Sequence, residues 1–131
     1  IFAFFNEIDA FIGENADDAE MKPYLEALTT AKAQLQDGTM WLMQNGMSNF
    51  DNAGASSHDY LQLFGLTALA LMWAKMAKAA LAQEPSSDPF YKNKLATARY
   101  YFERVLPDAT SHLAKVKTGA APVMALPADA F

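Results

Sequence analysis

A stretch without any charged side chain, from Leu63 to Ala74, constrains the fold of this chain more than any other feature. Thr67 is the only polar side chain among these twelve residues, and the longer segment from Asp59 to Gln83 is rich in helix-forming residues. A helix that crosses a bilayer needs about 20 apolar residues. The segment therefore predicts a central helix that is buried on most sides and does not span a membrane. Ser56, three residues before Asp59, resembles a capping arrangement at its start.

Two amphipathic segments precede this helix. In residues 2–12 the apolar side chains of Phe5, Ile8 and Ile12 recur at spacings of three and four, which predicts a helix, and no capping side chain stands before it. A bundle-type seam follows, formed by Leu28, Ala31, Leu35, Gly38 and Leu42. We expect the backbone of a neighbouring helix to come close at the glycine, and we expect this second helix to end at residues 45–46. The polar residues 47–57 predict a loop.

The last helix is predicted to begin near Phe90, after a turn at residues 84–89. Apolar side chains recur in it at steps of three and four as far as Val116, and Pro107 should kink or break it. Gly119 is the expected stop, and the tail of residues 120–131 is expected to be extended. The apolar side chains of this tail, which suggest that it lies on the bundle or on a partner, are Val123, Met124, Leu126 and Phe131.

No strand pattern is present, and Val occurs only three times, a composition that favours helix. The sequence therefore predicts an all-α fold: a single domain over residues 1–131, built as an up-and-down four-helix bundle with a kinked last helix and an extended C-terminal tail. The chain opens on Ile1 without an initiator Met or a basic, signal-like leader. Together with the uncapped first helix, this leads us to expect a piece of a longer, cytoplasmic protein.

Several kinds of chemistry are absent from the sequence. There is no cysteine, which excludes disulfides, thiol catalysis and cysteine-ligated metals. Ala stands three positions before both His58 and His112, so the Glu-x-x-His pairs of a di-iron bundle are missing. Ser57, His58 and Asp59 are consecutive, which is not the geometry of a catalytic triad. We expect no metal and no catalytic residue, and both histidines as solvated or capping side chains.

The charges are distributed unevenly along the chain. The net charge of −5 argues against nucleic-acid binding. Residues 1–72 sum to −8, with two basic and ten acidic side chains, whereas residues 73–131 sum to +3, with eight basic and five acidic ones. Most of these cations are interpreted as a solvated face with local pairs such as Arg99 with Glu103. The alternative is a patch for a phosphate-bearing ligand or an acidic domain, with Lys92, Arg99 and Arg104 as candidates.

Methionine and tryptophan gather at two places: Met40, Trp41, Met43 and Met47, and then Met72, Trp73 and Met76. Such residues at helical spacing are usually core or domain interface, and a cofactor site is the less common alternative. If this domain docks on a larger body, we expect some of these side chains to be exposed in the chain by itself.

Two long strings in the second half, DYLQLFGLTALALMWAKMAKAAL and FYKNKLATARYYFERVLPDATSHLAKVKTG, resemble a known family. The matching features are the Trp73-Ala74-x-Met76-Ala77 block, the Lys94-x-x-x-Ala98-Arg99-Tyr100-Tyr101 block, Leu106-Pro107, Gly119 and Phe131. They resemble the extra C-terminal domain that follows the catalytic body in one group of acyl-CoA dehydrogenases, which includes the 3-methylmercaptopropionyl-CoA dehydrogenase type. The first half agrees in helix order and length.

This resemblance implies a parent flavoprotein of fatty acid metabolism that holds FAD and oxidises an acyl-CoA to the 2,3-enoyl-CoA. In that family a Glu base and the flavin contacts belong to the upstream body, and an electron-transfer flavoprotein is the usual reoxidant. We therefore expect no catalytic residue and no cofactor in this chain. Its partners would be the catalytic body and the subunit interface of a homo-oligomer, and Lys92, Arg99 or Arg104 could contact the nucleotide end of coenzyme A.

The alternative is a non-enzymatic helical adaptor whose methionine-rich and aromatic surface binds a helix of another protein. Either interpretation predicts that the chain by itself shows no flavin absorbance and no dehydrogenase turnover.

Overall fold

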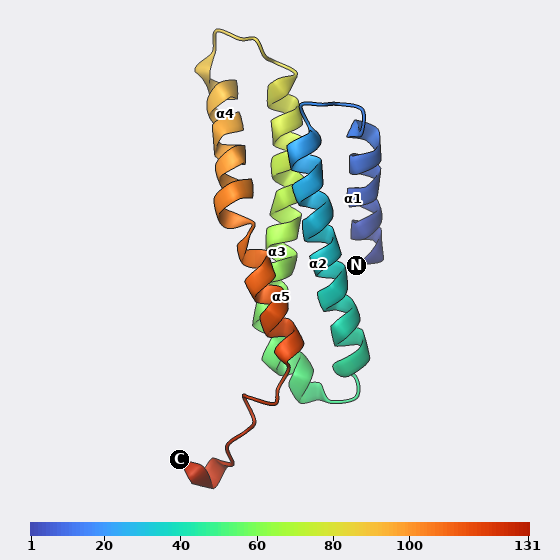
Figure 1. Ribbon diagram of the computed structural model, residues 1–131, viewed down its shortest axis with the longest axis vertical. Helices are drawn as coiled ribbons and strands as arrows, with labels where there is room; N and C mark the ends of the chain where they lie inside the picture. Colours follow the sequence, from blue (N-terminus) through green and yellow to red (C-terminus); the bar gives the residue numbers. More distant parts are fainter.

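Five α-helices make up the chain, and a computed structural model describes all of residues 1–131. Helices α1 (Phe2–Asn15), α2 (Lys22–Asn45) and α3 (Phe50–Leu81) run up and down in turn, and α4 (Pro89–Tyr100) and α5 (Asp108–Thr118) run back along α3 (Figure 1). A π-helical turn (Tyr101–Val105) joins α4 to α5, and these form one helix bent by 34°. The prediction of an all-α four-helix bundle with a kinked last helix is confirmed.

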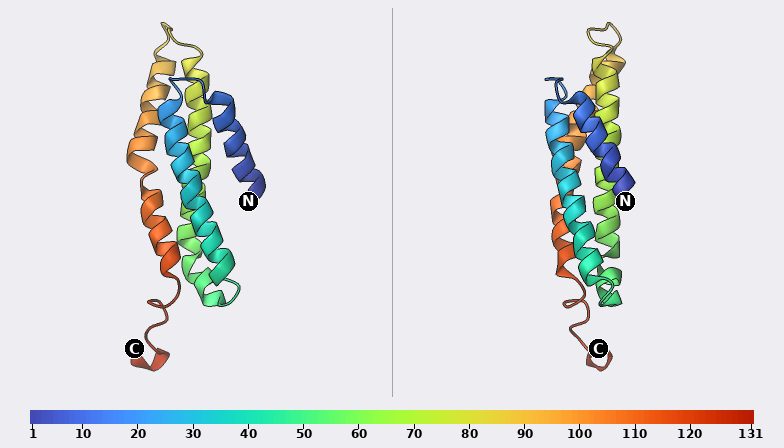
Figure 2. Two further views of the ribbon diagram at one scale, coloured as in Figure 1. Left: turned by 45° about the vertical axis from the view of Figure 1, so that its right-hand side comes forward. Right: turned by 90° about the vertical axis from the view of Figure 1, so that its right-hand side faces the viewer.

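Helix α3 is the centre of the bundle because α2, α4 and α5 all pack against it. Helix α1 and the bent α4–α5 helix lie on opposite sides of the α2–α3 pair (Figures 1 and 2). Leu63, Thr67 and Leu71 of the uncharged stretch are completely buried, as predicted. By length and composition alone α3 could cross a membrane, but the core helix of a bundle meets the same criterion. The helices packed around α3 are sufficient to explain its apolar sequence.

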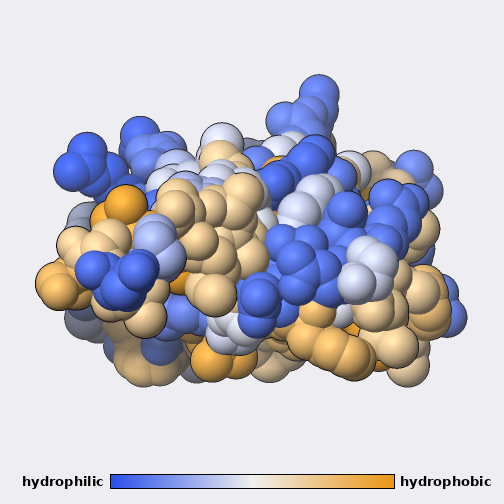
Figure 3. Space-filling model, turned by 90° about the horizontal axis from the view of Figure 1, so that it is seen from below, coloured by the Kyte–Doolittle hydropathy of each residue, from blue (hydrophilic) through white to orange (hydrophobic).

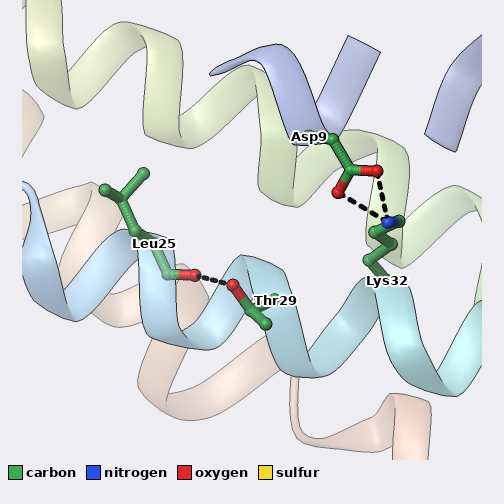
Figure 4. Close-up of polar contacts among 4 residues, drawn as sticks. All are labelled: Asp9, Leu25, Thr29 and Lys32. Atoms are coloured by element: carbon green, nitrogen blue, oxygen red, sulfur yellow. Dashed lines mark hydrogen bonds and ion pairs between the residues drawn. The ribbon is translucent and has the colours of Figure 1, made fainter. Parts of the chain in front are cut away.

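Two buried clusters form the core. The larger one lies in the upper half of the bundle and includes Ile8, Met21, Leu28, Leu71 and Tyr101. The smaller one consists of Phe5, Leu35, Leu63 and Ala109. Ion pairs hold α1 in place at its polar edge: Lys32 Nζ lies 2.5 Å from Asp9 Oδ1 (Figure 4), and Lys75 Nζ lies 2.7 Å from Glu7 Oε1.

The prediction of a loop at residues 47–57 is wrong for most of that segment. Helix α3 begins at Phe50, nine residues before Asp59, and the side chain of Asn49 caps it by accepting a hydrogen bond from the Asp51 amide. Ser56 is not a cap. Its buried hydroxyl donates to the carbonyl of Val116 at 2.8 Å, which ties α3 to α5.

The remaining local predictions for the first half are largely confirmed. Helix α1 begins without a side-chain cap, and α2 ends at Asn45 with Gly46 after it. Two details differ. Phe11 rather than Ile12 completes the buried face of α1, and at Gly38 it is the side chain of Leu63, not a helix backbone, that lies over the missing Cβ.

In the second half of the chain the predicted interruption at Pro107 and the predicted helix end at Gly119 are confirmed, and the tail differs. Pro107 lies two residues after the end of the π-helical turn and directly before α5, and Gly119 stops α5 with a φ of 68°. The tail then leaves the lower end of the bundle instead of lying on it (Figure 1). Its apolar side chains are exposed, and Phe131 is 94% exposed. Of the two expectations for the tail, contact with the bundle is therefore wrong, and contact with a partner stays a prediction.

Candidate docking surface

An apolar groove of about 620 Å³ runs between α2 and α3 near the end at which they are joined. We call it the lower groove. From α2 and the turn after it the lining residues are Thr39, Leu42, Met43, Gly46 and Met47. From α3 they are Phe50, Ala53, Ser57, Tyr60, Leu61 and Phe64. None of these side chains is charged, so the groove is suited to an apolar surface.

The groove is open because α1 covers only part of the α2–α3 pair. The Phe4 ring stacks on Phe64 at 5.2 Å between centroids, at the upper rim of the groove, and Phe5 packs beside Leu35. Beyond Leu35 helix α2 continues for ten residues to Asn45, or about 15 Å, with no further helix on this side. Met47 and Phe50 are consequently 75% exposed, and Leu61 is 67% exposed.

The polar atoms of the groove already have partners within the protein. The Thr39 hydroxyl lies 2.7 Å from the Leu35 carbonyl and 2.9 Å from the Tyr60 hydroxyl, and the Ser57 hydroxyl donates to the Gly54 carbonyl at 2.9 Å. Neither a nucleophile with a base nor a pair of carboxylates lies in the groove. The arrangement therefore fits docking of a protein segment.

The lower end of the molecule carries a second apolar element, the C-terminal tail. Val123, Met124 and Leu126 are all exposed on it. Seen from this end, the molecule shows apolar patches interrupted by hydrophilic side chains (Figure 3). Exposed apolar surface of this extent on a small domain is typical of a protein interface.

The three candidate cations are exposed side chains of α4 and of the π-helical turn. Arg99 Nε donates to Glu103 Oε1 at 2.9 Å, which confirms the predicted local pair, and both side chains are largely exposed. Lys92 and Arg104 are exposed and form no ion pair. Lys94 was not a candidate, and its ammonium lies over the rings of Trp73 and Phe90, 5.6 Å and 5.4 Å from their centroids. This Lys therefore takes part in packing α4 on α3.

The two histidines lie in different surroundings. His58 is exposed on α3, whereas His112 Nδ1 lies 2.8 Å from Asp59 Oδ1, with Lys115 at 3.8 Å from the same oxygen. Nowhere do three His, Asp or Glu side chains come together as metal ligands would. Asp59 thus joins α3 to α5 and is not part of a triad with its sequence neighbours. The pair was missed from the sequence because its members lie 53 positions apart.

The two methionine and tryptophan clusters have different positions in the structure. Met43 and Met47 of the first cluster line the lower groove, as expected for an interface. In the second, the half-buried Trp73 stacks on Tyr101 at 6.1 Å and packs against the larger core cluster. Burial raises the pKa of Tyr101 to about 12, and its hydroxyl donates to the carbonyl of Leu66. Burial also raises the pKa of Tyr24.

A comparison with protein families gives one match. The family model described as acetyl-CoA dehydrogenase C-terminal like matches residues 4–127, which is almost the whole chain. A comparison with curated proteins gives no match.

Proposed function

The chain belongs to the acetyl-CoA dehydrogenase C-terminal-like family, and we propose that it acts as the docking and assembly domain of a longer acyl-CoA dehydrogenase. In this proposal residues 1–131 follow the catalytic body of a FAD-dependent enzyme of the 3-methylmercaptopropionyl-CoA dehydrogenase type. The chain contributes no catalytic residue. It stabilises the enzyme by packing against the catalytic body or against the subunit interface of a homo-oligomer.

The observation that carries this proposal is the exposed lower groove in a chain whose family match is nearly complete. Fully burying one Met, Leu or Phe side chain stabilises a complex by about 1.5–3 kcal/mol before the costs of association are subtracted. Four large side chains of the groove are exposed: Met43, Met47, Phe50 and Leu61. Burial of these side chains would favour docking onto an apolar surface of the same enzyme.

The flavin belongs to the rest of the parent enzyme in this proposal. FAD supplies the acceptor for the hydride that leaves the acyl-CoA, and its pyrophosphate needs cationic side chains or free N–H donors. The lower groove does not fit it, because its lining is uncharged and its hydroxyls are already paired. Acyl-CoA and an electron-transfer flavoprotein are likewise proposed partners of the parent, in a cytoplasmic pathway of fatty acid metabolism.

The test is to remove residues 1–131 from the full-length enzyme and to measure its oligomeric state by light scattering and its melting temperature by the release of flavin. We expect a lower melting temperature or a smaller assembly. Leu61→Asp should reproduce the effect because Leu61 lines the groove. Leu69→Asp is the matched control, because this half-exposed Leu lies on the same helix outside the groove. Unchanged assembly and stability after the deletion would contradict the proposal.

Contact with coenzyme A is a separate part of the proposal. The exposed Lys92, Arg99 and Arg104 are available to the phosphates of the nucleotide end. Arg99→Ala and Arg104→Ala in the full enzyme should then raise the KM for acyl-CoA without lowering kcat. An unchanged KM in both variants would remove this role and leave the docking role intact.

The exposed methionine and aromatic side chains also favour the second candidate function, an adaptor that binds a helix of another protein. A pulldown distinguishes the two candidates. Recovery of only the catalytic body of the same enzyme supports the assembly domain, whereas stoichiometric recovery of a different protein supports the adaptor.

A further inference from the structure

The first turn of α1 lies at the upper rim of the lower groove. Phe4 contacts Phe64, which is also a lining residue, and Phe5 is buried against Leu35 and Leu63 just above it. Ile1 therefore enters the fold beside the point at which the covered face of the α2–α3 pair ends and the open groove begins. Any polypeptide attached to Ile1 starts next to this groove.

The C-terminal tail begins on a different side of α3. The Ala120 amide donates to Asn52 Oδ1 at 3.0 Å, and the Ser56 hydroxyl donates to the carbonyl of Val116. The end of α5 and the start of the tail therefore lie along the stripe of α3 that contains Asn52 and Ser56. The groove uses the adjacent stripe, which contains Ala53, Ser57 and Tyr60. The positive φ of Gly119 then directs the tail away from the bundle (Figure 1).

We infer that the lower groove is the binding site of the polypeptide segment that immediately precedes Ile1 in the parent enzyme. The inference rests on the proposed function, in which a catalytic body precedes this chain. A short tether gives a segment an effective concentration of about millimolar at a neighbouring site, which favours it over any free partner. The segment must present apolar side chains, since a charged one would lose its hydration against an uncharged lining without gaining a partner.

Photo-cross-linking in the full-length enzyme tests this assignment. Phe50→p-benzoylphenylalanine places the probe in the groove, at a position that is 75% exposed and tolerates the larger ring. Phe90→p-benzoylphenylalanine is the matched control, because this Phe is also exposed in the first turn of a helix but lies at the opposite end of the bundle. After irradiation the cross-linked peptides are identified by mass spectrometry in an equal mixture of ¹⁴N- and ¹⁵N-labelled enzyme.

The expected result is that the probe at position 50 cross-links mainly to the peptide that ends at Ile1 or just before it. Both parts of the cross-linked product should carry the same nitrogen isotope, which shows that they come from one polypeptide. The probe at position 90 should not cross-link to this peptide. Cross-links to residues 120–131, peptides of mixed isotopic composition, or the same peptide from both positions would overturn the assignment. The reactivity of Met47→Cys with maleimide measures whether the groove is open. If no cross-links form and this Cys reacts as fast in the full enzyme as in residues 1–131, the groove is empty in the enzyme and the assignment is overturned. A gene product without a dehydrogenase body before Ile1 would instead refute the proposed function itself.

Discussion

Leu61 and Leu63 lie two positions apart on α3, and replacing each by Ala should affect the stability of the isolated chain to very different extents. Leu63 is completely buried in the smaller core cluster with Phe5 and Leu35, and one of its methyl groups fills the space over Gly38. Leu61 is 67% exposed in the lower groove. Leu63→Ala therefore leaves a cavity between three helices, whereas Leu61→Ala removes a side chain that is mostly exposed to solvent.

The magnitudes follow from this difference in burial. Leu63→Ala should lower the free energy of unfolding by about 2–5 kcal/mol, because a buried Leu loses its transfer free energy and the cavity cannot close fully. Leu61→Ala should change it by less than about 0.5 kcal/mol. For 131 residues the entropy of unfolding converts a loss of about 3 kcal/mol into a decrease of about 11 °C in melting temperature.

Urea unfolding followed by circular dichroism measures the free energy of unfolding of both variants. The slope of this free energy against urea concentration, the m-value, should be the same in both, which shows that the same transition is compared. Equal losses in the two variants, or a loss below about 1 kcal/mol for Leu63→Ala, would refute this account of the core. In the full-length enzyme the groove should be filled, so that Leu61 is buried as well. The loss of stability caused by Leu61→Ala should then approach the loss caused by Leu63→Ala.

Two further predictions concern buried polar groups. Ser56→Ala should destabilise the chain by about 0.5–1.5 kcal/mol, since it removes the hydrogen bond to Val116, whereas Ser57→Ala on the exposed side of the same turn should have almost no effect in the same unfolding assay. Burial raises the pKa of Tyr101 from 10.0 to about 12, so its contribution to stability is complete below pH 10 and is lost as the pH rises towards 12. Tyr101→Phe should therefore flatten the alkaline decline in stability, and an unchanged decline would contradict this.

Periodicity predicted α1, α2 and the bent α4–α5 helix because each of them buries one stripe of its surface, whereas the uncharged stretch predicted α3. The seam at Leu28, Leu35 and Gly38 is the face of α2 that meets the rest of the bundle. The backbone signals were equally local: Pro107 lacks the N–H that would continue a straight helix, and Gly119 adopts a positive φ. Features of this kind need no knowledge of the partner segment, and they were predicted correctly.

Features that depend on a distant segment were missed. Residues 50–58 have the composition of a turn, with Asn52, Gly54 and two serines, yet they are helical because small side chains let α5 approach. Ser56 donates a hydrogen bond to the carbonyl of Val116, 60 positions later, and Asp59 contacts His112, 53 positions later. Nothing in the local sequence announces these contacts.

The candidate site was predicted in its chemistry but not in its shape. The sequence indicated that the methionine cluster at residues 40–47 could form an interface, and Met43 and Met47 line the groove. Four lining residues of the groove lie in the segment expected to be a loop, namely Met47, Phe50, Ala53 and Ser57, and the last three of them belong to α3. One wall of the docking surface is thus built by the helical turns that the sequence did not predict.

Gly54 offers a direct test of that wall. An added Cβ at Gly54 would meet nothing within 4 Å, and the same is true of Gly65, which lies in the part of α3 that the sequence predicted correctly. Ala is favoured over Gly inside a helix by about 1 kcal/mol. If residues 50–58 are helical, Gly54→Ala and Gly65→Ala should stabilise the chain by similar amounts in urea unfolding. A gain for Gly65→Ala together with a loss for Gly54→Ala would show that this segment is not helical, and the lower groove would then lack one of its walls.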